Sequence, residues 1–249
     1  MEQADQEQTE NIEHDLNQQI ETIRARLWQG DYDTQHEVIL NRTHSEAVTL
    51  RNLPLQIRSM RLLGTLAYLA MNLDQARTYI NRAMALAMRL QDTAEMLTLG
   101  ANLGYIYRGK GDPQEAVRRF TPFIEKLDLI EITPQLSRSA VTALLRYVVC
   151  LVLSHDYDQA QTRLQQANQI LKHYDETDLT PEESLGFSAY SAYARAVIAM
   201  ARGDYDSARV QCQKYDDANR RLGRYSERLL GRLLLLRVEL FTEPDEEAC

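Results

Sequence analysis

Basic residues are in short supply relative to acidic ones. The chain has 28 Lys and Arg residues against 36 Asp and Glu residues, which gives a net charge of -8 at neutral pH and a pI near 5.2. A protein that binds nucleic acids without sequence preference needs a basic surface to neutralise the phosphates. The composition therefore argues against direct nucleic-acid binding, and we expect none.

Cysteine, alternating patterns and long apolar runs are also scarce. The cysteines are Cys150, Cys212 and Cys249, without a Cys-x-x-Cys pair, which fits a reducing compartment better than a disulfide framework. No window alternates like a half-buried strand, and apolar runs such as 147–153 are shorter than the roughly 20 residues of a membrane span. Acidic residues follow Met1, where a secretory signal would be basic and then apolar. We therefore expect an all-α, cytoplasmic protein without membrane contact.

Turn signals in residues 102–120 predict a helical hairpin. Gly111 is suited to end a first helix, Asp112 to accept hydrogen bonds from the free amides of a second one, and Pro113 to occupy its first turn. A hydrophobic content of 44% with a mean hydropathy of -0.43 supplies enough apolar material for an array of such hairpins.

The packing positions of this hairpin carry a family resemblance. Leu103, Gly104 and Tyr107 share one helical face, on which the glycine lets a neighbouring helix approach closely. Ala116 and Phe120 have the same arrangement in the second helix. The pattern Leu-Gly-x-x-Tyr, then Ala, then Phe resembles the tetratricopeptide repeat (TPR), which pairs two antiparallel helices.

The same signals recur along the chain. The predicted cap positions are Asp31, Asn72, Asp112, Asp156 and Asp204. Four residues after each cap, a small residue is expected at the helix contact, and these positions are Gln35, Ala76, Ala116, Ala160 and Ala208. One turn later come the larger side chains of Ile39, Ile80, Phe120, Leu164 and Cys212. The spacing of 40 to 48 residues is longer than the roughly 34 of the standard repeat, and it resembles the longer variety of bacterial maltose-activator-type regulators and eukaryotic polarity scaffolds.

This resemblance implies an all-α fold, a right-handed superhelix (α-solenoid) of about five helical hairpins plus a C-terminal closing helix. We predict a disordered N-terminus over residues 1–10, a single TPR-like domain over 11–241 and an acidic C-terminal tail over 242–249.

A nucleotide-binding motif is almost present. Residues 104–110 match most of the Gly-x-x-x-x-Gly-Lys pattern of a phosphate-binding loop. However, Gly111 stands where Ser or Thr would bind magnesium, and the pattern follows a predicted helix instead of a strand. We interpret the segment as a hairpin turn and expect no nucleotide cofactor.

Metal and nucleophile patterns have simpler structural explanations. Asp-Tyr-Asp sequences begin at Asp31, Asp156 and Asp204, but a divalent ion needs several oxygens from one loop, whereas these aspartates recur at predicted helix starts. The five histidines show no ligand spacing, and the apolar neighbours of Cys150 favour a core thiol. The sequence supports no metal site, no cofactor and no enzyme class.

In this family the first helix of each hairpin lines a concave groove. The resemblance assigns a partner-binding groove to Arg24, Arg58, Arg61, Tyr68, Asn102, Tyr105, Arg108, Tyr190 and Tyr193. Repeats four and five are expected to continue it with mostly apolar side chains, among them Leu145, Val149 and Val152. Arginines and tyrosines in one groove suit a partner with carboxylates or phosphates beside apolar anchors. The alternative is that these arginines are solvated or pair with acids on the neighbouring helix.

These features predict a non-enzymatic scaffold that binds a protein or peptide with acidic and apolar residues. The alternative is the effector- or signal-peptide-sensing region of a bacterial signalling or transcription regulator. The closing helix adds a second surface, because four consecutive leucines, residues 233–236, point to all sides of a helix. Arg228, Arg232 and Arg237 on the outer side would make the helix a polar cap, whereas leucines there would dock a second copy or a following domain. We expect weak self-association through this helix.

Overall fold

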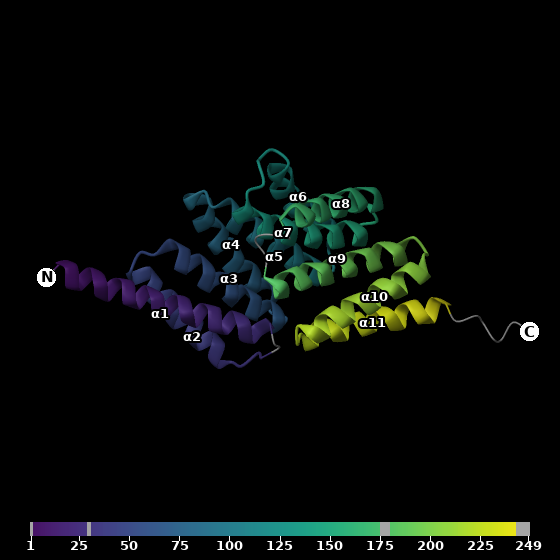
Figure 1. Ribbon diagram of the computed structural model, residues 1–249. Coiled ribbons are helices and arrows are strands. Elements are labelled where there is room, and N and C mark those ends of the chain that lie inside the picture. Colours follow the sequence, from purple (N-terminus) through teal and green to yellow (C-terminus); the bar gives the residue numbers. More distant parts are fainter. Residues whose placement is uncertain (1, 29–30, 175–179, 243–249) are drawn as a thin grey trace, which may run out of the picture. The chain divides into compact units, whose positions relative to one another are not determined.

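The computed structural model describes residues 2–28, 31–174 and 180–242, which form eleven helices and no strand (Figure 1). With 86% of the chain helical, the predicted all-α solenoid is confirmed. The helices are α1 (Glu2–Trp28), α2 (Gln35–Thr49), α3 (Leu53–Leu69), α4 (Leu73–Leu90), α5 (Thr93–Gly109), α6 (Pro113–Leu127), α7 (Pro134–Leu153), α8 (Tyr157–Tyr174), α9 (Pro181–Ala201), α10 (Tyr205–Arg221) and α11 (Tyr225–Thr242). This order corresponds to five hairpins and a closing helix.

The chain divides into two compact units, Met1–Asp112 (unit 1) and Pro113–Cys249 (unit 2). The division falls inside the segment 11–241 that we predicted as one domain. Helix α1 begins at Glu2, within the segment 1–10 that we predicted as disordered, while residues 243–249 of the predicted tail lie outside the described residues. The predicted boundaries stay predictions.

The small and large positions of the repeat are buried in four of the five repeats. The predicted small residues Ala76, Ala116, Ala160 and Ala208 are buried, and so are the larger side chains of Ile80, Phe120, Leu164 and Cys212 one turn later. Gly64 of α3 shows why a small residue is needed, because a Cβ atom there would lie 2.6 Å from Cδ1 of Ile80 on α4. Close helix contact therefore depends on the absence of a side chain at this position.

The first hairpin departs from the predicted register by one residue. Gln35 is exposed and Ile39 lies at the surface, whereas His36 and Leu40 are buried in their place. The prediction that Asp31 caps the second helix is also wrong, because α2 begins only at Gln35. The backbone N–H of Gln35 donates a hydrogen bond to Oδ1 of Asp33. A second aspartate nearer the helix thus replaces the one aligned with the other repeats.

The hairpin turns share one backbone conformation. The residue before each cap has a positive φ, at 60° for Met71, 76° for Gly111, 64° for His155 and 75° for Gly203. The caps that follow Met71, His155 and Gly203 accept hydrogen bonds from backbone N–H groups in the first turn of the next helix, as predicted; they are Asn72, Asp156 and Asp204. The left-handed residue reverses the chain and the cap satisfies the free amides.

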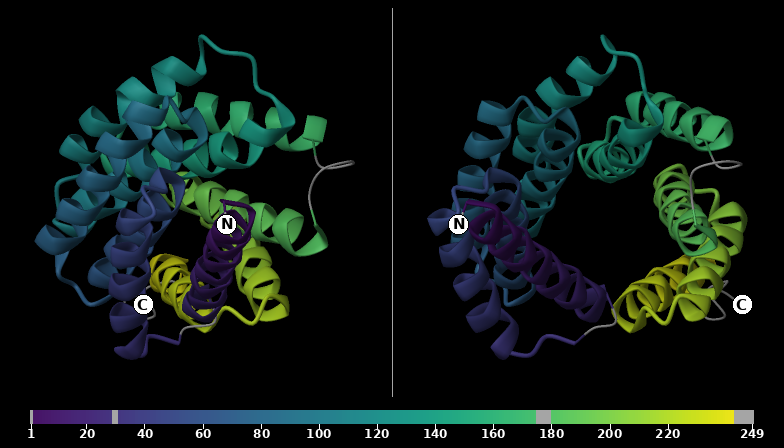
Figure 2. Two further views of the ribbon diagram at one scale, coloured as in Figure 1. Left: turned by 90° about the vertical axis from the view of Figure 1, so that its left-hand side faces the viewer. Right: turned by 60° about the vertical axis from the view of Figure 1, so that its left-hand side comes forward.

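Helix α7 is the core of unit 2. Its 20 residues are long and apolar enough to cross a membrane by length and composition, but 67% of that apolar window is buried inside the fold, as in the core helix of a globular protein. It packs against α6, α8 and α9, while α10 packs against both α9 and α11. Figure 2 shows α10 and α11 running side by side in unit 2.

Candidate functional site

Seven of the nine predicted groove residues lie in unit 1. Arg58, Arg61 and Tyr68 follow one another along α3 at helical spacing, and each is half-buried. Asn102, Tyr105 and Arg108 form the equivalent half-buried row on α5. Because α3 and α5 contact each other, the two rows make one surface, which we call the α3–α5 face.

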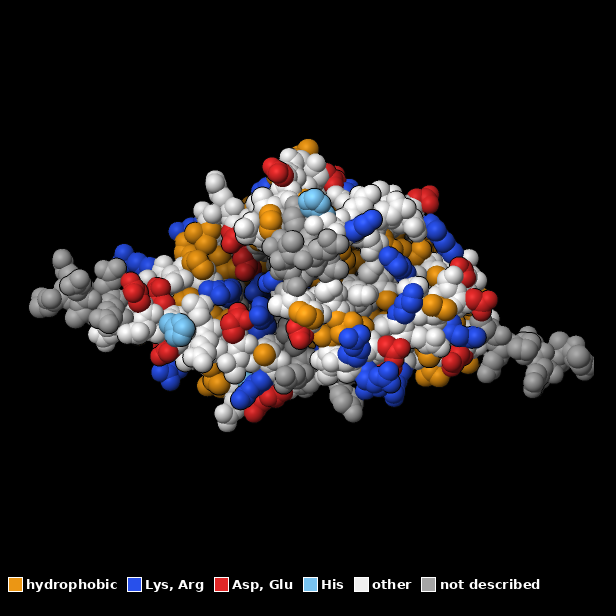
Figure 3. Space-filling view, in the orientation of Figure 1, with side chains coloured by type: hydrophobic (Ala, Val, Ile, Leu, Met, Phe, Trp, Pro, Cys, Tyr) orange, Lys and Arg blue, Asp and Glu red, His pale blue; other side chains and the backbone are white. Residues whose placement is uncertain are grey.

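A charged cluster occupies one end of the α3–α5 face. Nη1 of Arg61 lies 3.3 Å from Oε2 of Glu95 on α5, and both side chains are less than one-fifth exposed. Arg24 of α1 pairs with Glu21 on its own helix at 2.5 Å. In Figure 3, basic and acidic side chains lie next to one another over α3.

The arginines outnumber the carboxylates in this cluster. Burial lowers the pKa of Arg61, Glu95 raises it, and the nearby charges of Arg24 and Arg58 lower it again. The guanidinium keeps its charge at neutral pH, because an arginine side chain is effectively always protonated in proteins. Within the described residues no ion pair joins Arg58 to an acid, so three guanidinium groups share two carboxylates here. The cluster carries a net positive charge in an acidic protein.

An aromatic cluster occupies the other end of the face. The rings of Tyr68 and Tyr105 lie 6.4 Å apart, and the Arg108 guanidinium lies 4.1 Å from the centre of the Tyr105 ring. Gly109 leaves room for this arrangement, because a Cβ atom there would be 3.3 Å from Cε2 of Tyr68. Two neighbouring tyrosine rings beside an arginine offer an aromatic surface for an apolar or aromatic side chain.

Tyr190 and Tyr193, the other two predicted residues, belong to α9 in unit 2. Both are half-buried and one helical turn apart, and the Tyr193 ring lies 5.3 Å from that of Tyr215 on α10. They repeat the spacing of Arg58 and Arg61 with aromatic side chains in place of charges.

We predicted that apolar side chains of α7 would continue the groove surface, and this prediction is wrong. Leu145, Val149 and Val152 are all buried. The reason is that α7 packs against three helices, α6, α8 and α9, which enclose its apolar side chains.

Sequence reasoning missed the acidic members of the charged cluster. Glu95 lies three residues after Asp92, which accepts a hydrogen bond from its backbone N–H, so in the sequence it resembles an ordinary first-turn acid. The signal that could have revealed the pair was the sequence spacing between Arg61 and Glu95, which is about one repeat. Glu21 was hidden in the same way among the many polar residues of α1.

The segment 104–110, which resembles a phosphate-binding loop, belongs to α5 as far as Gly109, and the predicted turn begins only at Lys110. Nζ of Lys110 lies 2.5 Å from Oδ1 of Asp74 on α4. This hydrogen bond and the lysine charge hold the pKa of Asp74 below its ordinary value. Lys110 therefore joins α5 to α4. Among residues 2–28, 31–174 and 180–242, no group of three or more His, Cys, Asp or Glu side chains is arranged to hold a metal ion.

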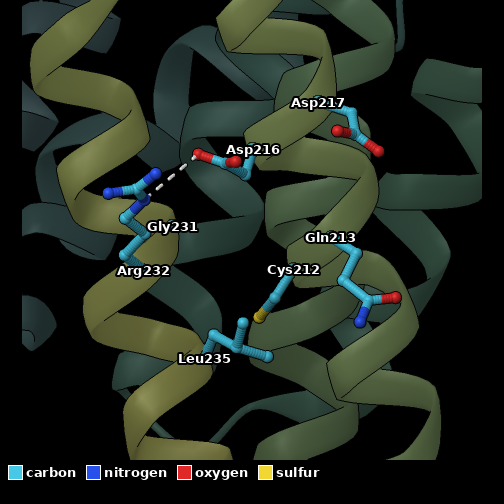
Figure 4. Close-up of a pocket in the computed structure, with 7 residues that line it drawn as sticks. All are labelled: Cys212, Gln213, Asp216, Asp217, Gly231, Arg232 and Leu235. Carbon is cyan, nitrogen blue, oxygen red and sulfur yellow. Dashed lines mark ion pairs between the residues drawn. The ribbon is translucent and has the colours of Figure 1, made fainter.

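A small cavity of about 230 Å³ lies between α10 and α11 in unit 2 (Figure 4). Its lining residues are Cys212, Gln213, Asp216, Asp217, Gly231, Arg232 and Leu235. Burial raises the pKa of the Cys212 thiol to about 11, so the thiol is protonated at neutral pH and is a poor nucleophile. Cys150 is likewise a buried free thiol, as predicted for a core residue.

Comparisons with known proteins identify the fold. No protein-family profile matches the sequence, and no curated protein sequence does. Three solved structures are similar across most of the chain: a Rap protein complexed with competence and sporulation factor (TM-score 0.55, 12% identity, 87% of this chain), BtubC (BKLC) from P. vanneervenii (0.56, 15%, 88%), and the nearly identical TPR-like repeats of a putative kinesin light chain from Podosopora anserina (0.52, 18%, 83%).

The coverage differs among these structures. The chain spans 62% of the length of the Rap protein, 92% of BtubC and 96% of the kinesin light chain repeats. With identities of 18% or less, the likeness concerns the fold. Together with the buried Ala positions and the hairpin turns described above, it shows that this chain has a tetratricopeptide-like repeat fold.

Proposed function

We propose that the chain is a non-enzymatic binding scaffold whose α3–α5 face holds an acidic peptide or an acidic segment of a protein. The observation that carries this proposal is the charged cluster, in which the guanidinium groups of Arg24, Arg58 and Arg61 share two carboxylates. The Rap protein, similar in fold, was solved with a bound factor, which supports binding as the general role of such an array.

Arg58 is the residue best placed to contact a ligand. Both Arg58 and Arg61 are half-buried, but Arg61 is already paired with Glu95. A guanidinium group binds a carboxylate through two parallel hydrogen bonds. Arg61 then acts as a fixed positive charge behind Arg58. It adds to the attraction for the ligand carboxylate while it stays paired with Glu95.

The distance between the two clusters defines the spacing in the ligand. Arg61 and Tyr68 are seven residues apart on α3, which corresponds to about 10 Å along a helix. An extended peptide covers that length in about three residues. The ligand we propose therefore carries a carboxylate about three residues from an apolar or aromatic side chain that packs on Tyr68 and Tyr105.

A peptide selection tests this proposal and does not require that the natural partner be identified. A phage library of random 12-residue peptides is selected on the wild-type chain, and the enriched peptides are synthesised and measured by calorimetry at low salt. We expect Asp or Glu about three residues from Leu, Phe, Tyr or Trp. We also expect Arg58→Glu to weaken binding at least tenfold, because it reverses the charge opposite the ligand carboxylate.

Arg89→Glu is the matched control, since Arg89 is exposed on the second helix α4 and the change in net charge is the same. Equal weakening by both variants would show a general charge effect. Enriched peptides that lack acidic residues, or that bind Arg58→Glu as well as the wild type, would reject the α3–α5 face as the site.

The alternative is an effector-sensing region of a signalling or transcription regulator, and the bound factor of the Rap structure is the observation that keeps it open. Sensing requires that the ligand change a second activity. A regulatory output domain encoded next to this chain would favour sensing, whereas recovery of a stable protein complex from the source cell would favour the scaffold.

A further inference from the structure

The outer side of α11 carries a stripe of exposed leucines. Four leucines of this helix are more than half exposed, and so is Phe241 at its end; the leucines are Leu229, Leu233, Leu236 and Leu240. Val238 on the opposite side is fully buried, and Gly231 packs so closely on α10 that a Cβ atom there would be 2.8 Å from Cδ1 of Tyr215. The leucine stripe therefore points away from α10.

The spacing of the stripe suits a helix as its partner. The four leucines follow one another at steps of four, three and four residues, which is the spacing of the core positions in a coiled coil. Side chains at this spacing fit between those of an identical helix. In Figure 3, hydrophobic and basic side chains lie beside one another over α11.

The charges along the stripe select the orientation of that partner. Arg232 and Glu239 border the stripe on one side, and Arg237 borders it on the other, as the helical positions place them. In a parallel pair, Arg232 would face the partner's Arg237, and the like charges would repel. In an antiparallel pair, Arg232 faces the partner's Glu239. The two-fold symmetry then places Glu239 opposite the partner's Arg232, so that the same contact forms twice.

We propose that α11 pairs with α11 of a second copy of this chain as a two-fold antiparallel helix pair, with Leu233 packed against the partner's Leu236. The arrangement is self-complementary, as an isologous interface requires. Arg232 is available for it, because its side chain is 64% exposed and its intrachain contact with Asp216 is long, at 4.0 Å. This interface is on unit 2 and does not depend on the peptide site proposed for the α3–α5 face.

The association is weak. The stripe covers eleven residue steps, or about 16 Å of helix, and buries less than the roughly 1,200 Å² of a standard interface. Since α11 is already folded on α10, pairing does not have to nucleate a helix. We expect a dissociation constant in the micromolar range or above.

Charge reversal with mixing tests both the interface and its orientation. Sedimentation is measured for the full chain from micromolar to near-millimolar concentration, with reductant because the chain has three cysteines. Arg232→Glu and Glu239→Arg are each expected to be monomeric, since each places like charges opposite one another. A mixture of the two is expected to form a heterodimer at least as tight as the wild-type dimer, because both pairs become opposite in charge.

The leucine stripe is tested by Leu233→Glu with Leu236→Glu, which is expected to abolish association. Both side chains are mostly exposed, so circular dichroism and thermal melting should remain as in the wild type. Arg237→Glu is the control, because Arg237 faces the partner's Leu230 in the antiparallel pair and its reversal should leave association within twofold. A wild-type chain that stays monomeric throughout, or a dimer that persists in the double leucine variant, would overturn the proposal. A mixture that stays monomeric would reject the antiparallel orientation.

Discussion

Helices α5 and α7 hold the same position in the repeat but present different surfaces. On α5, Asn102, Tyr105 and Arg108 remain half-buried and polar. The equivalent row on α7 ends in Val149 and Val152, which are buried in a helix that packs against α6, α8 and α9. The comparison teaches that the repeat geometry alone does not keep a row of side chains accessible.

The strongest test of this difference is to exchange the side chains at two equivalent positions, Arg108 of α5 and Val152 of α7. Val152→Arg places a charge in the core of unit 2, with an expected loss of about 3 kcal/mol or more. Arg108→Val removes the contact of the guanidinium with the Tyr105 ring at a half-buried position, with a smaller expected loss of about 1 kcal/mol. Urea unfolding followed by circular dichroism measures both. Similar losses at the two positions would mean that α5 is as enclosed as α7.

A second prediction concerns the ion pair that gives the α3–α5 face its charge. Arg61→Met leaves Glu95 largely buried without its partner, and we expect a loss of roughly 1–3 kcal/mol. Glu95→Gln added to Arg61→Met should recover part of this loss, because the uncompensated charge is gone. The test is a double-mutant cycle of unfolding free energies. Strictly additive losses would show that the two side chains do not interact.

The hairpin turns offer a stabilising change. Met71 has a φ of 60° and an exposed side chain, whereas Gly203 serves the same turn in unit 2 with a φ of 75°. Met71→Gly removes the strain of a side chain in the left-handed region and should stabilise the protein by about 0.5–1 kcal/mol. Gly203→Ala should destabilise it by a similar amount. Thermal melting at one pH compares the two, and opposite signs are required.

The smallest expected effect is a pH dependence located in unit 2. Hydrogen bonds from Arg163, at 2.7 Å, and Gln166 lower the pKa of Asp128 from its ordinary 3.8. The folded pKa lies below the unfolded one, so this contribution is present above the unfolded pKa and is lost as pH falls through the folded pKa. Asp128→Asn should therefore lower the melting temperature at pH 7 and make less difference at pH 3. A constant difference across this range would rule out the linkage.

Much of the fold was accessible from the sequence because the repeat signals are local. Caps such as Asn72 and small residues such as Ala76 act through contacts within one hairpin, and the structure places them as predicted. The first hairpin was misjudged by one residue, since Asp31 and Asp33 are equally good caps in sequence and only the burial of His36 and Leu40 distinguishes them.

Only part of the candidate site could be predicted from the sequence. Positions on the α3–α5 face follow from helical spacing, which explains why the sequence could place Arg58 and Tyr68 on one face. The pairing of Arg61 with Glu95 depends on the packing of two helices far apart in sequence, and no local pattern encodes it. The burial of α7 has the same origin, because it depends on the packing of α6, α8 and α9 around it.

The apolar sequence of α7 also affects how the protein unfolds and loses its native structure on heating. In the native state its apolar residues are enclosed by α6, α8 and α9. Unfolding of unit 2 releases a continuous 20-residue apolar segment, and unfolded chains that expose such segments aggregate faster than they refold. Heat inactivation should therefore be irreversible and depend on the scan rate, so that the useful lifetime of the protein is determined by how fast unit 2 opens.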